Sequence, residues 1–221
     1  MNASPTALNQ APDFRLHRFR GPMNAAFFSV LGPAIEWNVR RHKQRLLANL
    51  PPTVVEIGPG VGANLKYLAA GSTLVAIEPN THMHRRLRVA ARRRGVQLDL
   101  RTVPAERTRL PDHSVDAVLS SLVLCSVTDP AAVLAEIRRI LRPGGTFRFL
   151  EHVAARPGSP TRLLQRAVRR PWAWTFEGCS CERDLAGLID AGGFARVDIT
   201  PFRVHGPFVP FNTQIAGVAS A

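Results

Sequence analysis

The glycine-rich segment Glu56-Ile57-Gly58-Pro59-Gly60-Val61-Gly62 constrains the fold of this chain more than any other feature. It follows a β-branched run at 53–55 and precedes an apolar stretch at 63–70, so the sequence predicts a strand, a tight turn and a helix. Glycine permits positive φ angles and leaves room for a ligand beside the backbone. With the N–H groups of the predicted helix, this turn predicts a cradle for a nucleotide-bearing cofactor.

The glycine spacing alone fits more than one cofactor. Gly58-x-Gly60-x-x-Ala63 also matches the dinucleotide fingerprint, which permits alanine at its third position. Two acids narrow the choice. Glu56 ends the first predicted strand, and Glu78 follows the apolar run 73–77, where its carboxylate can accept hydrogen bonds from both ribose hydroxyls. A strand, turn and helix with glycines that serve packing alone would not explain why both acids stand at these positions.

Length and composition predict one domain with a substantial core. The chain has 221 residues, of which 45% are hydrophobic. No apolar run approaches the ~18 residues of a membrane span, and the N-terminus lacks the apolar core of a signal peptide. Three cysteines do not make a disulfide framework, so we expect a cytoplasmic protein with reduced thiols and no transmembrane segment.

The net charge of +13 comes almost entirely from arginine. Six arginines gather in the predicted helix after Glu78: Arg85, Arg86, Arg88, Arg92, Arg93 and Arg94. Such a cluster is compatible with a surface for RNA or membrane. We favour a solvated helix face and expect no nucleic-acid partner, because aromatic residues that would stack on bases are not interleaved with the arginines.

Strand and helix patterns alternate after the glycine motif. Strands are predicted at 53–57, 73–77, 98–103, 115–120 and 146–151, and helices at 63–70, 80–94 and 130–141. Asp129 is the predicted N-cap of the last helix and Pro130 its first residue. This alternation is typical of a parallel sheet covered by helices on both faces.

The two ends of the chain have a different pattern. Residues 1–21 are polar and predict a flexible N-terminus, whereas 22–50 predict two helices broken near Gly32-Pro33. After a predicted helix at 182–191, two strands at 194–200 and 213–220 predict an antiparallel pair at the sheet edge.

With these elements in order, the chain resembles the class I S-adenosyl-L-methionine (SAM) methyltransferases, whose first motif is an acid followed by Gly-x-Gly-x-Gly. The resemblance implies an α/β, Rossmann-like three-layer sandwich: a seven-stranded, mostly parallel sheet with the last strand antiparallel, plus an N-terminal helical lid at 22–50. It implies SAM as cofactor and S-adenosyl-L-homocysteine as product. We expect a single methyltransferase domain over 22–221, with a substrate-side insertion at 156–181.

The resemblance also assigns residues to the cofactor, mostly at the carboxyl ends of strands. Ala105 and Glu106 match the position that flanks the adenine. The full expected set is Glu56, Gly58, Gly60, Gly62, Asn64, Glu78, Pro79, Met83, Ala105, Glu106, Ser121 and Leu122. Asp116 matches an acid that opens the fourth strand, and we assign it a structural role bonded to nearby backbone.

Several segments narrow the resemblance to the alkyl-thiol S-methyltransferase branch (methyltransferase type 11-like). They are Leu122 to Val127, Leu141 to Gly145, Glu151 to Ala155, and Glu177-Gly178-Cys179 with Arg183. The mammalian members are membrane-anchored, and the microbial relatives cap thiols of small molecules. The resemblance therefore implies S-methylation of a small thiol, in natural-product biosynthesis or detoxification. The chain departs from this branch at Pro59 and in its N-terminal segment, where 22–50 stands in place of the membrane helix.

His152 and Cys125 are the candidate catalytic residues. A histidine that ends a parallel strand beside a carboxylate can take a proton from a thiol, hydroxyl or amine, whereas Cys125 faces substrate or is a core thiol. The expected substrate contacts are Phe27, Phe28, Trp37, Trp174 and Cys179. Cys179-x-Cys181 is at most half of a metal motif, so no metal site is expected.

Three alternatives to S-methylation remain at this point. The first is methylation of nitrogen or oxygen in a small-molecule pathway, which a strict need for His152 would favour. The second is an NAD-dependent oxidoreductase. The third is a basic RNA-binding protein, which would bind RNA in a salt-sensitive way.

Overall fold

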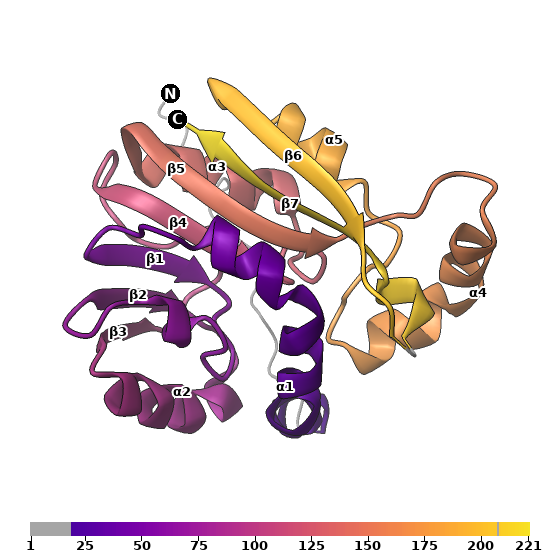
Figure 1. Ribbon diagram of the computed structural model, residues 1–221, viewed down its shortest axis with the longest axis horizontal. Coiled ribbons are helices and arrows are strands. Elements are labelled where there is room, and N and C mark those ends of the chain that lie inside the picture. Colours follow the sequence, from indigo (N-terminus) through magenta and orange to yellow (C-terminus); the bar gives the residue numbers. More distant parts are fainter. Residues whose placement is uncertain (1–18, 207) are drawn as a thin grey trace, which may run out of the picture.

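The seven strands form one sheet in the order β3-β2-β1-β4-β5-β7-β6 (Figure 1). A computed structural model describes residues 19–206 and 208–221. Strands β1 to β5 pair in parallel, and β7 runs antiparallel to both β5 and β6. The predicted Rossmann-like sheet with an antiparallel last strand is confirmed. The strands are β1 (Thr53–Ile57), β2 (Thr73–Ile77), β3 (Gln97–Arg101), β4 (Val115–Ser121), β5 (Leu141–His152), β6 (Arg196–Arg203) and β7 (Thr213–Ser220).

Helices cover both faces of this sheet. Alternate strand residues point to opposite faces, so Val55 and Ile57 of β1 join a cluster with α3 and α5, whereas Val54 joins a cluster with α2. The α-helices are α1 (Arg20–Leu46), α2 (Thr81–Arg94), α3 (Pro130–Ile140), α4 (Pro160–Thr175) and α5 (Leu185–Asp190), with 3-10 turns η1 (Leu65–Tyr67) and η2 (Val209–Phe211). Within the described ranges, none of these helices is long and apolar enough to cross a membrane.

The N-terminal helical segment differs from the prediction of two helices. The chain forms a single helix, α1, with Pro33 inside it. Ala25 before the proline and Val39 after it are both buried, so packing on both sides outweighs the lost backbone hydrogen bond. The predicted flexible N-terminus falls largely on 1–18, outside the described residues, and Arg20 and Gly21 already belong to α1.

The prediction of a helix after the glycine motif is also wrong. Only the short turn η1 forms there, because Gly62 has a φ of 91° and Leu68 is already extended. A Cβ at Gly62 would lie 2.6 Å from a side-chain carbon of Leu65. The glycine loop therefore uses the residues that the prediction gave to a helix start. Elsewhere the largest difference in element bounds is in β5, which begins at Leu141 and so includes residues 142–145 ahead of the predicted start at 146.

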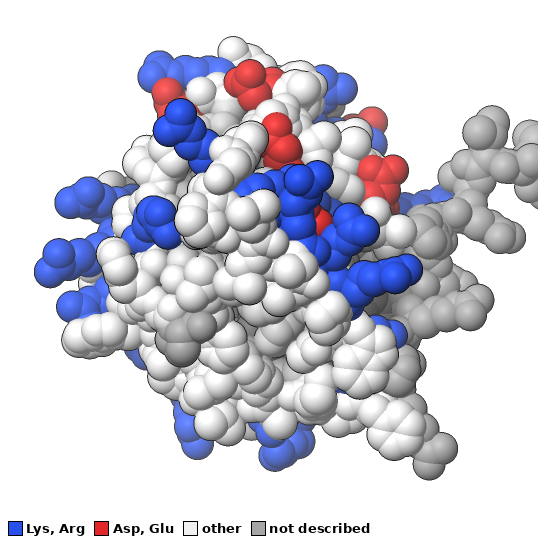
Figure 2. Space-filling model, turned by 90° about the vertical axis from the view of Figure 1, so that its right-hand side faces the viewer, with Lys and Arg blue, Asp and Glu red and all other residues white. Residues whose placement is uncertain are grey.

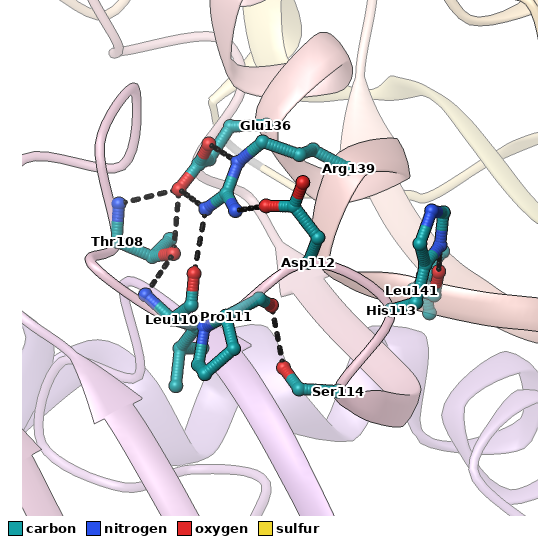
Figure 3. A network of polar contacts seen from close by, with 9 residues as sticks. All are labelled: Thr108, Leu110, Pro111, Asp112, His113, Ser114, Glu136, Arg139 and Leu141. Carbon is teal, nitrogen blue, oxygen red and sulfur yellow. Dashed lines mark hydrogen bonds and ion pairs between the residues drawn. The ribbon is translucent and has the colours of Figure 1, made fainter.

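A polar network fixes the loop between β3 and β4 onto α3 (Figure 3). The Glu136 carboxylate accepts hydrogen bonds from the Thr108 N–H at 2.8 Å and the Thr108 hydroxyl at 2.6 Å. Arg139 donates to Glu136 and to the Leu110 carbonyl, and pairs with Asp112. The network thus fixes the part of this loop that leads into β4.

Replacing Glu136 tests how much this network contributes. Glu136→Ala would leave the buried Thr108 donors and the Arg139 guanidinium without their shared acceptor, so we expect a loss of about 3 kcal/mol in unfolding free energy. Urea denaturation measures it. The control is Asp116→Ala, which removes an exposed ion pair with Arg142 and should change stability by about 0.5 kcal/mol or less. Equal losses in the two variants would contradict this account.

Candidate active site

A cavity of about 300 Å³ lies beyond the carboxyl ends of β1, β2, β4 and β5. Ligands bind at this edge in open α/β sheets. One wall comes from the loops after these strands, and the opposite wall comes from α1, the end of α4 and the region of η2. Its walls therefore join segments from both ends of the chain, which lie side by side in Figure 1.

The glycine loop forms one side of the cavity. Gly58 and Gly60 have φ values of 60° and 59°, a region that other residues rarely adopt. A Cβ at Gly58 would lie 2.7 Å from Cγ2 of Val123, and one at Gly60 would lie 3.3 Å from the Met83 sulfur. Both positions therefore require glycine for conformation and for space. Gly62 does not line the cavity but packs against α2.

Glu78 holds this loop in position. Its carboxylate accepts a hydrogen bond from the Gly60 N–H at 2.9 Å and another from the Asn80 N–H at 2.8 Å. Burial raises the pKa of Glu78 to about 7, although these two donors oppose the shift. Each carboxylate oxygen retains a lone pair, so Glu78 can still accept from a ligand.

A buried charged network connects α1 to the glycine motif. The Lys43 ammonium, 3% exposed, donates to Glu36 at 2.7 Å and to Asn64 at 2.8 Å. Asn64 in turn donates to Oε1 of Glu56 at 2.7 Å. Burial raises the pKa of Glu56 to about 7. Its Oε2 atom has no hydrogen-bond partner among the described residues, and Glu56 lines the cavity.

Another buried carboxylate, Glu151, organises the opposite end of the cavity. It accepts hydrogen bonds from the Ser120 hydroxyl at 2.7 Å and from the backbone N–H groups of Val123 and Leu124 at 3.1 and 3.2 Å. The turn that it holds includes Leu122, whose φ of 63° is unusual for a side chain of this size. Glu151 thereby fixes the chain that leads from β4 to Cys125.

His152, Cys125 and Cys179 meet at this end. Nε2 of His152 lies 3.0 Å from the Cys179 sulfur, and the two sulfurs are 3.5 Å apart. The hydrogen bond between the two cysteine sulfurs lowers the pKa of Cys179 well below its ordinary value, and His152 adds to this effect. The same hydrogen bond, with burial, raises the pKa of Cys125. Burial alone would lower the pKa of His152. The charge of Cys179 and its hydrogen bond to His152 raise it by more, so the net shift of the pKa is upward.

Aromatic side chains form the wall opposite the sheet. Phe27 of α1 contacts Phe176 and Phe208 with ring centroids 5.2 and 6.0 Å apart, so three separate segments meet there. Phe28 and Trp172 also line the cavity. The wall is apolar and comes mainly from α1 and the predicted insertion.

The structure places two of the expected substrate contacts outside the cavity. Trp37 is 68% exposed, because nine residues of helix put it half a turn away from Phe28, and the Arg40 guanidinium stacks on its ring. Trp174 is 62% exposed. In the same helix it is Trp172 that faces inward, and its indole N–H donates to the Cys179 sulfur at 3.3 Å.

The other expected site residues do line the cavity. They are Phe27, Phe28, Glu56, Gly58, Gly60, Asn64, Glu78, Pro79, Met83, Ala105, Glu106, Ser121, Leu122, Cys125, His152 and Cys179. Sequence reasoning missed Glu36 and Lys43, which carried no signal among the many charges of α1. It also missed Trp172 and Phe176, although the aromatic insertion that contains them was recognised.

The helices that cover the cavity also expose apolar side chains. Figure 2 shows the side where α4 lies in Figure 1; uncharged side chains make up most of its lower half, and Lys and Arg gather above and around the edge. Exposed apolar residues on these covering elements include Val30, Leu163, Trp174 and Val209. The arginine-rich face of α2 is a separate surface, where most of the arginines are exposed.

Comparison with known proteins assigns the family. Residues 55–149 match a family model described as a methyltransferase domain. The chain is similar to human thiol S-methyltransferase TMT1A, with 33% identity over 150 residues that cover 66% of this chain and 62% of that protein. It is also 33% identical to rat thiol S-methyltransferase TMT1B over 174 residues, 76% of this chain and 70% of the relative. The chain belongs to the SAM-dependent methyltransferases.

The fold of this methyltransferase has close counterparts among solved structures. A complex between the Trm112 methyltransferase activator and a methyltransferase from Haloferax volcanii matches with a TM-score of 0.66 at 18% identity, covering 93% of this chain and 99% of the other. At this identity the likeness shows the fold alone. The family assignment removes the oxidoreductase alternative that the glycine spacing left open.

The methyltransferase cavity fits SAM. Two buried oxygen atoms, Oε2 of Glu56 and Oγ of Ser121, belong to cavity-lining residues and have no hydrogen-bond partner among the described residues. A polar ligand end would satisfy them. Gly58 and Gly60 of the glycine loop line the cavity with backbone that carries no side chain. These are the features that a ligand with a charged amino-acid end and a ribose requires.

Glu56 should make the ligand-free methyltransferase less stable as pH rises. Its folded pKa of about 7 exceeds the ordinary 4.5, so between these values the folded state holds a proton that the unfolded state has lost. Stability therefore falls as pH rises from 4.5 to 7, by about 3 kcal/mol from this group. Glu56→Gln removes that component, so its stability advantage over wild type in urea denaturation should grow from about pH 5 to about pH 8. An advantage that is constant with pH would contradict this account.

Proposed function

We propose that this methyltransferase transfers the SAM methyl group to the sulfur of a small thiol, in a biosynthetic or detoxifying role. The observation that carries the proposal is the group of His152, Cys125 and Cys179 on the cavity wall beyond β4 and β5. An imidazole and two thiols can hold a sulfur acceptor by weak and charge-assisted hydrogen bonds. The similarity to thiol S-methyltransferases supports the same acceptor class.

The cofactor-binding residues divide into three groups in this proposal. Glu78 accepts hydrogen bonds from the ribose hydroxyls, while Glu56 and Ser121 bind the amino-acid end. Ala105 and Glu106 flank the adenine, on the loop that the Glu136 network fixes to α3. When bound, SAM supplies a methyl group that its sulfonium already activates, which leaves the protein to position the acceptor and exclude water.

A thiol acceptor matches the chemistry that this cavity offers. A thiol with a pKa of about 8.5 is partly ionised at neutral pH, so it needs less help from a base than a hydroxyl does. The aromatic wall from α1 and α4 excludes water, and α1 acts as the lid over the acceptor. The protein then needs only to position the thiol with the aromatic wall and to bind its sulfur with the polar groups at the sheet edge.

A panel of acceptors tests the function directly. Purified protein with SAM is given small alkyl thiols and dithiols, matched amines and phenols, and release of S-adenosyl-L-homocysteine is followed. We expect turnover on the thiols, with kcat/KM at least about tenfold higher than on the matched oxygen and nitrogen compounds. Turnover on amines or phenols with inert thiols would overturn the thiol assignment and leave the methyltransferase family intact.

Glu78→Ala tests the cofactor site separately. It removes an acceptor for two ribose hydroxyls and the support of the Gly60 N–H, so we expect Kd for SAM, measured by calorimetry, to rise at least about 100-fold. Glu78→Gln keeps one carbonyl acceptor, so its Kd for SAM should lie between those of wild type and Glu78→Ala. Asp99→Ala, on an exposed residue of β3 outside the cavity, is the control and should bind like wild type. Wild-type affinity in Glu78→Ala would remove Glu78 from the site.

A further inference from the structure

Three possible metal ligands converge from distant parts of the chain. The Cys125 and Cys179 sulfurs and a His152 ring nitrogen all lie within 4.8 Å of one another, and all three residues are buried. The sulfur–sulfur distance is 3.5 Å and the sulfur–Nε2 distance to His152 is 3.0 Å. Tetrahedral zinc, with bonds of ~2.3 Å to sulfur and ~2.0–2.1 Å to nitrogen, requires separations of roughly 3.5–3.8 Å between these atoms. Shifts of about half an ångström would bring the two pairs that include the Cys179 sulfur to that geometry, and the third pair, the Cys125 sulfur and the His152 ring nitrogen, lies within 4.8 Å.

The three residues lie on three separate segments of the chain. Cys125 follows the turn that Glu151 fixes, His152 ends β5, and Cys179 follows α4. The Ser180 N–H donates to the Cys125 carbonyl at 2.8 Å, which joins the two cysteine segments through the backbone. A site carried on supported elements keeps its geometry without the ion.

Hydrogen-bond donors surround the sulfurs as they do in metal–thiolate sites. The Trp172 indole N–H donates to the Cys179 sulfur at 3.3 Å, and the Ser126 hydroxyl lies 3.5 Å from the Cys125 sulfur. Such outer contacts orient thiolate ligands and stabilise their negative charge.

All three residues also line the cavity, which decides the kind of site. Structural zinc sites are closed by four protein ligands, whereas catalytic sites have three and leave one position open. We infer that Cys125, His152 and Cys179 bind a zinc-like divalent ion whose fourth position faces the cavity. Two thiolates and one imidazole favour zinc over the hard cations magnesium and calcium.

The occupant of the fourth position rests on the proposed function. A thiol that binds there gives its proton to solvent and stays bound as a thiolate, next to the place where the methyl group is delivered. The sequence did not predict this site, because the local pair Cys179-x-Cys181 is at most half of a metal motif. Cys181 faces elsewhere, with its sulfur 3.6 Å from the Gln165 carbonyl.

Metal content of the full chain tests the inference without an activity assay. Protein is kept reduced, stripped with a chelator, reloaded with zinc or cobalt, desalted and analysed by mass spectrometry. We expect about one ion per chain, and for cobalt the charge-transfer bands of thiolate ligands with the visible bands of a tetrahedral ion. Cys125→Ser and Cys179→Ser should each weaken binding at least about tenfold. Cys181→Ser is the matched control and should bind like wild type.

A shift of the cobalt spectrum on addition of a small thiol, but not of a matched amine, would support the open position. Folded wild-type protein that binds SAM but retains no ion would overturn the metal site. So would equal loss of the ion in Cys181→Ser and Cys179→Ser. Thiol turnover in a metal-free protein would overturn the open position as the place where the acceptor binds, and a loaded site without thiol turnover would overturn the acceptor assignment alone.

Discussion

The carboxylate of Glu151 is the contact on which the acceptor end depends. It is fully buried at the end of β5, and three donors from β4 and the following turn satisfy one of its oxygens. Burial raises the pKa of Glu151, which means that keeping its charged form at this position costs folding free energy. In return the turn with the strained Leu122 is fixed, and Cys125 follows at a defined place beside His152. Without this contact, the parallel pairing of β4 and β5 would not determine the geometry beyond their ends.

The rest of the cavity is built from segments that are far apart in the chain. α1 comes from the N-terminal part, the aromatic wall from the connection between β5 and β6, and Phe211 from the turn before β7, where it contacts His152. The sheet supplies polar groups at fixed positions, and the covering helices supply apolar surface. The polar groups of the cavity thus come from the ends of the sheet strands, whereas its apolar wall comes from connections outside the sheet.

Local sequence patterns were sufficient for the sheet and the cofactor loop. β-branched runs located the strands, and β7 was predicted at its observed bounds because turn residues delimit it clearly. Long-range contacts decided the remainder. Cys179 reaches His152 and Cys125 across 27 and 54 residues, a proximity that no local pattern encodes. Trp172 and Trp174 look equivalent in sequence until the helix rotation of α4 is known. The continuous α1 formed despite Pro33 because buried residues on both sides hold it.

The buried ammonium of Lys43 connects the helix α1 to the glycine motif through hydrogen bonds. It donates both to Glu36 on α1 and to Asn64 beside Glu56, so a displacement of the helix changes the electrostatic field at Glu56. A ligand at Glu56 acts on the helix through the same contacts. If SAM and the acceptor bind as proposed above, linkage requires that they share one coupling free energy: the factor by which either changes the affinity of the other is the same in both directions. In that proposal one lysine connects the two substrates before any chemistry occurs.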